Sequence, residues 1–492
     1  MLKTIHRFGK YLILALLVAV PVFGHLDTLC IRVWDESRLA INAYEMYENG
    51  DLIVTHFYGN PDMWNTKPPL LIWAQAFLMN IVGVNELAIR LPSAMAAFGT
   101  CLLLLLFSLR YLRSFWFGFI AILVLLSSSG YVNIHGTRTG DYDAMLTLFT
   151  TASGIFFFAF CETNKQKYLY YVFLLTALAV LTKSVSGLLF VPAMAMYSMT
   201  QRQFIPLFTN KHFYLGLLSF LSLVLSYYLI RELQNPGYIA AVQENELGGR
   251  FLEAVEDHSD GLWFYLRIMV DHQLSGWYLL VPCGLLTGFL IKDKKINRLT
   301  LFLMVMIVTF FVIISIAQTK LEWYDMPLFP FLALLIAIFV HYVFQLLENL
   351  SWANQTLTVN ILPFLFLFLI GITPYGAILN KTYKPQEDEG NQFEKYQYEM
   401  TYYLKAAVRG KYDLNHHVLL YDGYSPQNHF YAKLLNEKGV LLAQKDWEAL
   451  QSQEVVLANQ LHVKQYLEGH YDHEILEVNG GIVKYRIHGR KD

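Results

Sequence analysis

Long apolar runs separated by short polar connections make up most of the chain, and this pattern predicts a bundle of membrane-spanning helices. A helix needs roughly 20 apolar residues to cross a bilayer core of about 30 Å. By this measure we expect about eleven spans, at residues 11–30, 91–109, 115–133, 144–161, 168–182, 185–200, 213–231, 277–291, 299–317, 326–345 and 358–378. The predicted fold class is therefore an α-helical polytopic membrane protein.

Basic residues are concentrated in alternate connections, which gives the expected orientation. With the N-terminus inside, the cytoplasmic side collects Lys3, Arg7, Lys10, Arg110, Arg113, Lys165, Lys167, Arg202, Lys211, Lys292, Lys294, Lys295 and Arg298. Such an excess follows the positive-inside rule. The stretch 168–200 is counted as two short spans that meet at Lys183 on the outer side, because a single span would turn "KDKKINR" (292–298) outward. The N-terminal apolar run is interpreted as a retained first span.

This orientation places three polar regions outside the membrane: residues 31–90, 232–276 and 379–492. In the last region, short apolar runs alternate with polar positions. Its Asn479-Gly480-Gly481 lies between two strand-like segments, which is a hairpin signal. We therefore expect a transmembrane domain, 1–378, that carries the first two regions as outer loops, and a small soluble α/β domain, 379–492.

Composition agrees with this reading and excludes some classes of protein. Hydrophobic residues make up 55% of the chain and charged residues only 15%, whereas soluble proteins carry roughly a quarter charged residues. The net charge of −2 gives no basic surface for nucleic acid. Four cysteines, all in or beside apolar segments, argue against a disulfide framework.

The first outer loop carries two polar patches beside apolar sequence. In "RVWDESRLAINAYEMY" (32–47), apolar residues recur at helical spacing after Asp35, which predicts an amphipathic helix lying along the membrane surface. Asp35 suits a helix N-cap and a chemical role equally well. In "NTKPPLLIW" (65–73), two prolines stiffen the chain after Lys67. That lysine either points at a fixed partner or extends to lipid headgroups.

Two later segments bring more charged side chains to the same side. "GTRTGDYDAML" (136–146) places Asp141 and Asp143 at the entrance to a span. Two such carboxylates suit metal binding or the positioning of a hydroxyl, and helix capping is an equally good account. Lys183, in "LTKSVSG", lies between apolar segments, where a charge is costly unless it meets a partner or a ligand.

Further candidates lie in the remaining outer connections. Lys320 and Tyr324, in "QTKLEWYDMPLFP", lie between two long spans, and Arg250 follows a glycine pair in the 232–276 loop. Several cations at a membrane surface suit a phosphate whose lipid tail stays in the bilayer. A nearby carboxylate then suits a general base for an attacking hydroxyl, with the lipid phosphate as the leaving group.

At these residues the chain resembles a known family. The motifs are, in chain order, "WDESRLAINAYEMYENGD", "TKPPLLIW", "NELAIRLPSA", "GDYDAMLTLF", "LTKSVSG" and "TKLEWYDMPLFP". Their order and spacing are similar to those of the bacterial type C glycosyltransferases, in particular the aminoarabinose transferases that modify lipid A, and more broadly the protein O-mannosyltransferase family. The resemblance covers roughly residues 30 to 340.

The resemblance implies an inverting glycosyltransferase that uses a polyprenyl-phosphate sugar as donor. It implies that Asp35 is the catalytic base and that Asp143 is the acidic residue that begins the fourth span. Donor-binding positions of the family fall at Lys67, Lys183, Arg250, Lys320 and Tyr324. The acceptor is expected to be a lipid, a glycan or a protein, at the outer face of a bacterial inner (plasma) membrane, and no nucleic acid partner is expected.

The chain departs from the family where a metal is concerned. Relatives that modify lipid A carry Glu-Lys-Pro in the first loop, whereas Thr66 precedes Lys67 here. Their metal-ligand histidine has no counterpart in "ENELGGRF", where Glu244 and Glu246 are the weak candidates. Candidates for contact with the acceptor or a metal are Asp141 and Glu36. A divalent metal ion is the one cofactor considered, and no organic cofactor is expected.

Two other functions are compatible with a membrane protein of this kind. A flippase of polyprenyl-linked sugars would call for ionisable residues near mid-membrane and paired broken helices. A polymerase or ligase of lipid-linked glycans would also use outer loops, but not this first-loop carboxylate with a Lys-Pro-Pro segment. Because the charges cluster at one interface, the sequence favours glycosyl transfer.

Overall fold

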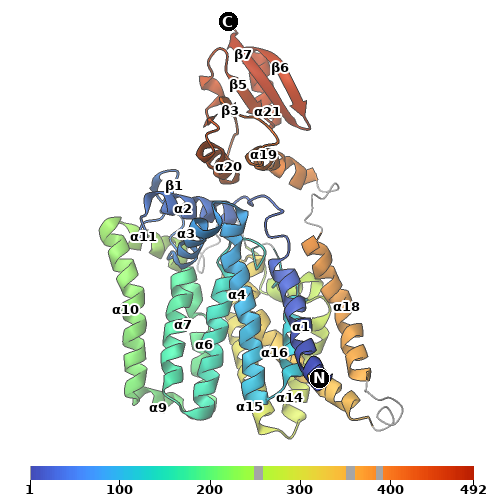
Figure 1. Ribbon diagram of the computed structural model, residues 1–492. Coiled ribbons are helices and arrows are strands. Elements are labelled where there is room, and N and C mark those ends of the chain that lie inside the picture. Colours follow the sequence, from blue (N-terminus) through green and yellow to red (C-terminus); the bar gives the residue numbers. More distant parts are fainter. Residues whose placement is uncertain (1, 134, 249–258, 351–360, 384–391, 492) are drawn as a thin grey trace.

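The computed structural model describes residues 2–133, 135–248, 259–350, 361–383 and 392–491. Figure 1 shows an upright bundle of helices with a small domain of strands and helices stacked on one end. Helix α2 (Asp35–Asn49) runs crosswise between the two layers. The N-terminus lies toward the opposite end of the bundle from the small domain (Figure 1).

Among the described residues, the larger layer is helical apart from one short hairpin in the first loop and an isolated bridge between Ser259 and Thr319. Its other α-helices are α1 (Leu2–Phe23), α3 (Leu70–Val82), α4 (Glu86–Phe107), α5 (Phe115–Leu126), α6 (Asp143–Thr163), α7 (Lys167–Lys183), α8 (Val191–Thr200), α9 (Phe204–Phe208), α10 (Lys211–Gln234), α11 (Tyr238–Val242), α13 (Phe264–Ile268), α14 (Leu280–Leu290), α15 (Lys294–Ile316), α16 (Phe329–Glu348) and α18 (Leu362–Tyr383). The hairpin pairs β1 (His56–Phe57) with β2 (Asn60–Pro61).

Each predicted span coincides with a helix of this bundle, but the helices differ in length. In the described part of the chain, seven helices are long and apolar enough to cross a membrane, or up to eight if one bent pair counts as a span. The predicted spans at 11–30, 115–133 and 185–200 fall on shorter apolar helices. The count of eleven therefore stays a prediction, whereas the multi-pass helical architecture is confirmed.

The span predicted at 115–133 ends early because serines interrupt it. Ser127 and Ser128 donate their hydroxyl protons back to the Leu123 and Val124 carbonyls, at 2.6 and 2.7 Å. Such bonds compete with the helical backbone pattern. Beyond them the chain passes close to Phe329, because a Cβ at Gly130 would lie only 2.2 Å from that ring. The residues that follow α5 thus lead into the loop that carries Asp141.

The span predicted at 277–291 belongs to a bent pair. Residues Phe264–Gln273 and Trp277–Leu290 meet at an angle of 119°. The bend is local: Ser275 and Gly276 both adopt positive φ, 49° and 88°, a region that costs a serine more than a glycine. At the end of the first arm, Gln273 donates to the Glu322 carbonyl at 2.9 Å.

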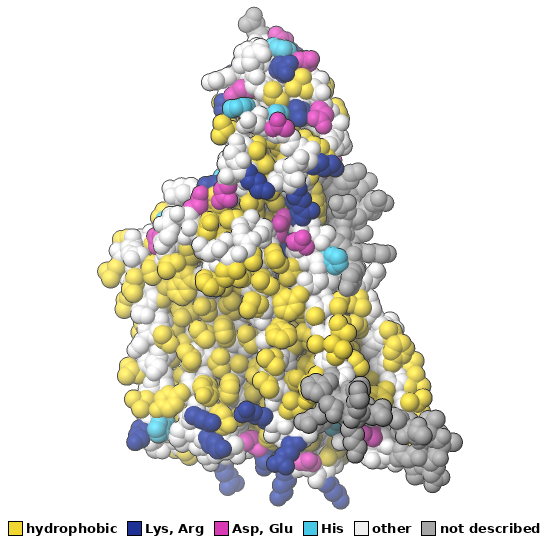
Figure 2. Space-filling model, viewed as in Figure 1, with side chains coloured by type: hydrophobic (Ala, Val, Ile, Leu, Met, Phe, Trp, Pro, Cys, Tyr) yellow, Lys and Arg dark blue, Asp and Glu magenta, His cyan; other side chains and the backbone are white. Residues whose placement is uncertain are grey.

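The surface of the bundle is that of a membrane protein. Figure 2 shows hydrophobic side chains over the middle of the bundle, with Lys and Arg gathered at the end away from the small domain. Charges of both signs mix at the other end and over the small domain (Figure 2). An apolar band between two polar ends is expected where lipid surrounds the protein.

The predicted amphipathic helix after Asp35 is confirmed as α2. Its apolar residues Leu39, Ala40, Ala43 and Tyr44 are buried, while Tyr47 is partly exposed. The helix ends at Gly50, whose φ of 72° suits glycine, and the Gly50 N–H closes the helix on the Met46 carbonyl. The buried face of α2 lies against α3 and the small domain, which fixes the first loop between the two layers.

The small domain on one end of the bundle, called the outer domain below after its predicted location, is a mixed α/β unit, as predicted. Its five strands pair in the order β4-β3-β5-β7-β6, with β3 parallel to β4 and β5, and β7 antiparallel to β5 and β6. The elements are α19 (Gln392–Val408), β3 (His417–Leu419), α20 (Pro426–Glu437), β4 (Leu442–Gln444), β5 (Val455–Ala458), α21 (Leu461–His470), β6 (Tyr471–Asn479) and β7 (Ile482–Arg490). The predicted hairpin is confirmed, because Asn479 pairs with Ile482 across the glycines.

Candidate active site

Two adjoining cavities open beneath α2 and differ in character. The polar cavity is lined by Asp35, Arg38, Trp64, Asn65, Asp141, Tyr142 and Trp323, and the apolar cavity includes Leu146, Leu189, Phe310, Ile313 and Ile314. Lys67, Asp143, Lys183 and Tyr324 line both cavities. The structure thus brings together five of the predicted catalytic and donor-binding residues, with four of them at the junction between a polar and an apolar space.

The first fixed pair at the junction is Lys183 with Asp143. The Lys183 Nζ lies 2.6 and 2.8 Å from the two carboxylate oxygens of Asp143, and both side chains are buried. Lys183 is the last residue of α7 and Asp143 is the first of α6. Each charge is therefore also stabilised by the helix dipole, because a cation is favoured at a helix C-terminus and an anion at an N-terminus. Lys183 lies 5.0 Å from the centre of the Tyr324 ring.

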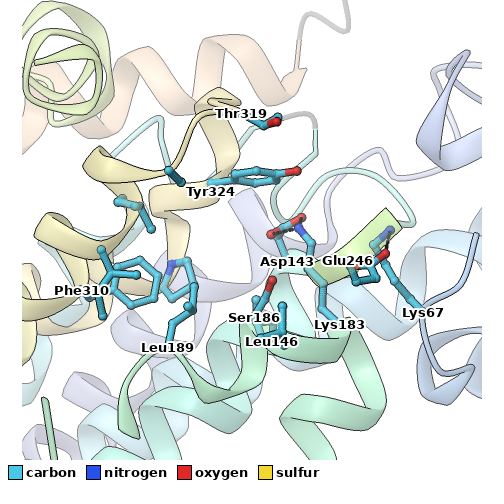
Figure 3. Close-up of a pocket in the computed structure, with 15 residues that line it drawn as sticks. Lys67, Asp143, Leu146, Lys183, Ser186, Leu189, Glu246, Phe310, Thr319 and Tyr324 are labelled. Atoms are coloured by element: carbon cyan, nitrogen blue, oxygen red, sulfur yellow. Dashed lines mark hydrogen bonds and ion pairs between the residues drawn. The ribbon is translucent and has the colours of Figure 1, made fainter. Parts of the chain in front are cut away.

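Figure 3 shows the second pair, in which Lys67 and Glu246 point toward each other. The Lys67 Nζ is 3.1 Å from Glu246 Oε1, and the Thr66 hydroxyl donates to the same oxygen at 3.4 Å. Lys67 of the first loop is therefore paired with a carboxylate of the 232–276 loop. The Thr66 carbonyl accepts from the Tyr238 hydroxyl at 2.7 Å, which ties the two loops together.

Asp35 differs from these residues in being exposed. Its side chain is 61% exposed and lies 3.9 Å from His135 Nδ1. The N-cap position of α2 is occupied by Trp34, which forms no side-chain cap bond, so the capping account of Asp35 does not describe this helix. Trp34 has a φ of 73°, a strained value for a bulky residue, of the kind found at functional sites.

Asp141 lies on the buried side of the same polar cavity. One ligand atom each of Asp35, His135 and Asp141 lies within 4.8 Å of the others. Burial raises the pKa of Asp141 from 3.8 to about 7, and Asp35 and Glu36 add to this effect while His135 opposes it. Asp141 Oδ1 is buried and has no hydrogen-bond partner among the described residues. The His135 ring stacks on Trp323 at 3.9 Å.

Other predicted site residues lie elsewhere. Lys320 is buried and donates to the Ala317 carbonyl at 2.6 Å, and it lines neither cavity. Arg250 lies outside the described residues. Glu244 is exposed, and Glu246 pairs with Lys67. Neither belongs to the one group of possible metal ligands found among the described residues, which is Asp35, His135 and Asp141. That group adds His135, for which the sequence analysis gave no role.

Glu36 is buried against other parts of the protein and does not line the polar cavity. Its carboxylate receives the Arg90 guanidinium at 2.6 and 2.9 Å, the Arg32 N–H at 2.8 Å and the Gly140 N–H at 2.9 Å. Burial alone would raise the pKa of Glu36, but Arg90 and these donors hold it below the ordinary value. With its oxygens occupied in this way, Glu36 is not part of the ligand group formed by Asp35, His135 and Asp141, and its contact with an acceptor or a metal stays a prediction.

Sequence reasoning missed Arg90 and the pair formed by Arg38 and Asp62. Arg90 is 1% exposed and lies in the first turns of α4, inside the quoted motif "NELAIRLPSA". A charge at the start of an apolar span was the available signal. Arg38 binds Asp62 through two hydrogen bonds, 2.8 and 2.6 Å, and both residues belong to the first loop. These pairs hold the loop that carries Asp35.

Comparison with known proteins agrees with this architecture. Residues 66–229 match the family model described as dolichyl-phosphate-mannose-protein mannosyltransferase. The undecaprenyl phosphate-alpha-4-amino-4-deoxy-L-arabinose arabinosyl transferase of Aeromonas hydrophila is 29% identical over 310 residues, which are 62% of this chain and 55% of the relative. A transferase of the same name from Proteus mirabilis is 29% identical over 334 residues, 66% of this chain and 58% of that relative. The match thus spans little more than half the length of these relatives.

Solved structures show the same fold over nearly the whole chain. The crystal structure of ArnT from Cupriavidus metallidurans bound to undecaprenyl phosphate aligns with a TM-score of 0.72 at 14% identity, covering 97% of this chain and 98% of ArnT. An oligosaccharyltransferase from Archaeoglobus fulgidus aligns with a TM-score of 0.52 at 12% identity, over 88% of this chain and 64% of that protein. The predicted resemblance is confirmed as a likeness: this chain is a multi-pass membrane protein that has the fold of ArnT and is similar in sequence to the aminoarabinose transferases and, over residues 66–229, to the protein mannosyltransferase family model.

Proposed function

We propose that the protein is an inverting glycosyltransferase that moves a sugar from a polyprenyl-phosphate donor to an acceptor hydroxyl. The observation that carries the proposal is the junction of the two cavities, where Lys67 and Lys183 line both a polar and an apolar space. A lipid-linked sugar phosphate has the matching form: an apolar tail, one phosphate and a polar ring. Lysine ammonium groups at the junction suit the phosphate.

The donor would lie across the junction. Its tail would enter the apolar cavity beside Leu189 and Phe310, on the opposite side of Figure 3 from Lys67. Its phosphate would meet Lys67 and Lys183, and its sugar would extend into the polar cavity toward Asp35. The carboxylates of Glu246 and Asp143 keep both ammonium groups charged and oriented before the donor arrives, because an unpaired buried charge is costly.

Asp35 is the proposed general base. It removes the proton from the acceptor hydroxyl as the hydroxyl oxygen forms a bond to the anomeric carbon. The bond from that carbon to the phosphate oxygen breaks with inversion, and polyprenyl phosphate leaves. Lys67 and Lys183 stabilise the charge that develops on the leaving phosphate, which is the largest contribution such a site can make. The exposure of Asp35 gives an acceptor access from the outer side.

The proposal extends to substrates and location. The relatives' names make undecaprenyl phosphate-linked 4-amino-4-deoxy-L-arabinose the first donor to test, and the acceptor class is a lipid, a glycan or a protein. The site lies at the end of the bundle that faces the outer domain, and Lys and Arg gather at the other end (Figure 2). By the positive-inside rule the site would face the outer side of a bacterial inner membrane, with the N-terminus in the cytoplasm.

A divalent cation is a proposed cofactor. Asp35, His135 and Asp141 would hold it, because carboxylate and imidazole atoms within 4.8 Å of one another, with one buried carboxylate oxygen unsatisfied, fit such an ion. When bound, the ion would supply a positive charge beside the base and lower the cost of ionising Asp141. Asp35 and Asp141 would then be held in one arrangement instead of repelling each other.

The test measures release of free polyprenyl phosphate by the purified protein in lipid, with native membrane extract as the source of acceptor. The wild type and Asp35→Asn are compared on the same donor, with Asp472→Asn, an exposed aspartate of β6, as the matched control. Release by the wild type and the control alone supports the proposal. Equal release by all three removes Asp35 from the chemistry. Movement of intact donor between leaflets without release would indicate a flippase instead.

A further inference from the structure

The chain that leads into Asp35 is unusual for a buried segment, because it contains no helix or strand. Residues 24–33 connect α1 to α2, and Cys30, Ile31, Arg32 and Val33 are buried before the chain emerges at exposed Trp34. Buried backbone groups must find hydrogen-bond partners, and regular structure does not supply them here. The partners are side chains from two directions.

From the bundle side, the segment is held by one arginine of α4. Arg90 donates through Nη1 to the carbonyls of Leu26 and Leu29, at 2.7 and 2.8 Å, and through Nη2 to the carbonyl of Cys30 at 2.7 Å. The same guanidinium binds Glu36, the residue after Asp35. Since Glu36 also accepts from the Gly140 N–H, Arg90 links the segment to the loop that carries Asp141.

From the other side, the segment is held by the outer domain. Lys405 of α19 donates to three successive carbonyls, those of residues 27, 28 and 29, at 2.5, 3.0 and 3.1 Å. The Tyr431 hydroxyl of α20 accepts from the Ile31 N–H at 3.1 Å, and the Tyr398 hydroxyl of α19 accepts from the Val33 N–H at 3.2 Å. The outer domain thus binds the last buried residues before Asp35.

The two sides meet at Glu86, one helical turn before Arg90 on α4. Glu86 Oε1 accepts from the Tyr431 hydroxyl at 2.6 Å and lies 2.9 Å from Lys405 Nζ. Residues four apart in a helix share a face, so Glu86 and Arg90 present one surface to the segment and to the outer domain. The contacts form a continuous network from α4 through the segment to α19 and α20.

Asp35 itself has no comparable support. In the part of the chain that the structure describes, its carboxylate accepts no hydrogen bond, and its nearest charged neighbour is His135 at 3.9 Å. An exposed side chain whose nearest charged neighbour is 3.9 Å away is placed mainly by its backbone. The atoms that fix this backbone include three side chains of the outer domain, so the location of the base depends on a domain that lines neither cavity.

We propose that the outer domain is a positioning element for Asp35, and that Lys405, Tyr431 and Tyr398 are positioning residues of the transfer reaction. This inference rests on the proposed function. These residues do not contact the donor junction, so they should act on turnover rather than on donor binding. Displacing a catalytic group by about 1 Å can cost on the order of a hundredfold in rate.

The test removes two hydroxyl groups and no ring. In Tyr398→Phe with Tyr431→Phe, the rings keep their packing while the acceptors for the Ile31 and Val33 N–H groups are lost. We expect kcat for release of polyprenyl phosphate to fall roughly tenfold to a hundredfold, with donor KM unchanged. Tyr403→Phe is the matched control, because Tyr403 is buried on the same helix, α19, and stacks on Tyr412. An unchanged kcat in the double variant overturns the proposal.

Two further measurements separate positioning from general damage. Combined with Asp35→Asn, the double variant should lose little more activity than Asp35→Asn alone, because residues that act through one group are not additive. Full additivity contradicts the proposal. Hydrogen exchange of peptides covering residues 26–35 should accelerate in the double variant and not in Tyr403→Phe. This last measurement needs no activity, so it tests whether the outer domain holds residues 26–35 even if the proposed reaction is wrong. Unchanged exchange overturns the inference.

Discussion

The proposed donor end of the site, at Lys67 and Lys183, and the proposed base end, at Asp35, are held in place by opposite means. At the donor end, Lys183 and Lys67 are fixed through their side chains, by buried ion pairs with Asp143 and Glu246. At the base end, the Asp35 side chain is exposed, and only its backbone is fixed, by Arg90 and the outer domain. A group that binds a phosphate can be rigid, whereas a group that takes a proton must be reachable by an acceptor.

The largest effect on activity is expected at the base end. Asp35→Asn should lower the rate of polyprenyl phosphate release by about a hundredfold to ten-thousandfold, the usual contribution of a general base. Because the side chain is 61% exposed and forms no ion pair with a buried lysine, the melting temperature should stay within a degree or two of the wild type. Thermal unfolding in detergent beside the release assay measures both. A large loss of stability would contradict the contrast between the two ends.

The donor end should show loss of activity and stability together. Lys183→Met leaves the Asp143 carboxylate buried without its partner, and breaking such a pair costs about 3–5 kcal/mol. Release should also fall by roughly a hundredfold. The variant Lys183→Met with Asp143→Leu should regain stability, because neither charge remains, but not activity. Recovery of activity in the double variant would show that the pair is structural only.

The proposed cation would couple the base end to pH. Burial raises the pKa of Asp141 to about 7, so the folded protein keeps this carboxyl protonated over a range in which the unfolded chain, at 3.8, has lost the proton. The cost of ionising Asp141 to the stability of the folded protein is absent below pH 3.8, grows as the pH rises and is complete above about pH 7. A cation must displace the proton at pH 6 but not at pH 8, so Mn²⁺ should bind about tenfold more tightly at pH 8.

Thermal shift with Mn²⁺ at the two pH values measures this difference without an activity assay. Asp141→Asn is the control, and its response to Mn²⁺ should be small at both pH values. A shift of equal size at pH 6 and pH 8, or one that survives in Asp141→Asn, would place the ion elsewhere.

The smallest effect is expected at the second ion pair. In Glu246→Gln, the carboxylate that competes with a phosphate for Lys67 is gone, while a polar side chain of similar size remains. Polyprenyl phosphate should bind more tightly, by roughly threefold to tenfold, which corresponds to the net value of about one hydrogen bond. Product inhibition measures the change. Weaker binding would mean that Glu246 serves chiefly to orient Lys67.

Much of the architecture could be predicted from the sequence because it depends on local pattern. The apolar spans, the amphipathic helix after Asp35 and the hairpin at Asn479 each follow from neighbouring residues. The prediction that two short spans meet at Lys183 came from the distribution of basic residues; in the structure α7 ends at Lys183 and α8 begins at Val191. The motif residues that line the two cavities were found because the family resemblance supplied their order.

The remaining features could not be predicted because they join residues far apart in the chain. Glu246 lies 180 positions from Thr66, and the separation between Lys405 and the Leu29 carbonyl is 376. Nothing in a periodic pattern specifies such partners. The pairing of Glu36 could not be foreseen for the same reason, because its partner Arg90 lies 54 positions away.

The contact between Ile31 and Tyr431 spans 400 residues and has a consequence for how the protein is made. Ribosomes add about 5–20 residues per second, so the first loop waits roughly 20–80 seconds for the partner that completes it. During that interval the carbonyls and N–H groups of the segment lack the partners that Tyr431, Tyr398 and Lys405 later supply. In the proposed orientation and function, Asp35 would therefore reach its final position only after the domain that contains Tyr431 has crossed the membrane and folded.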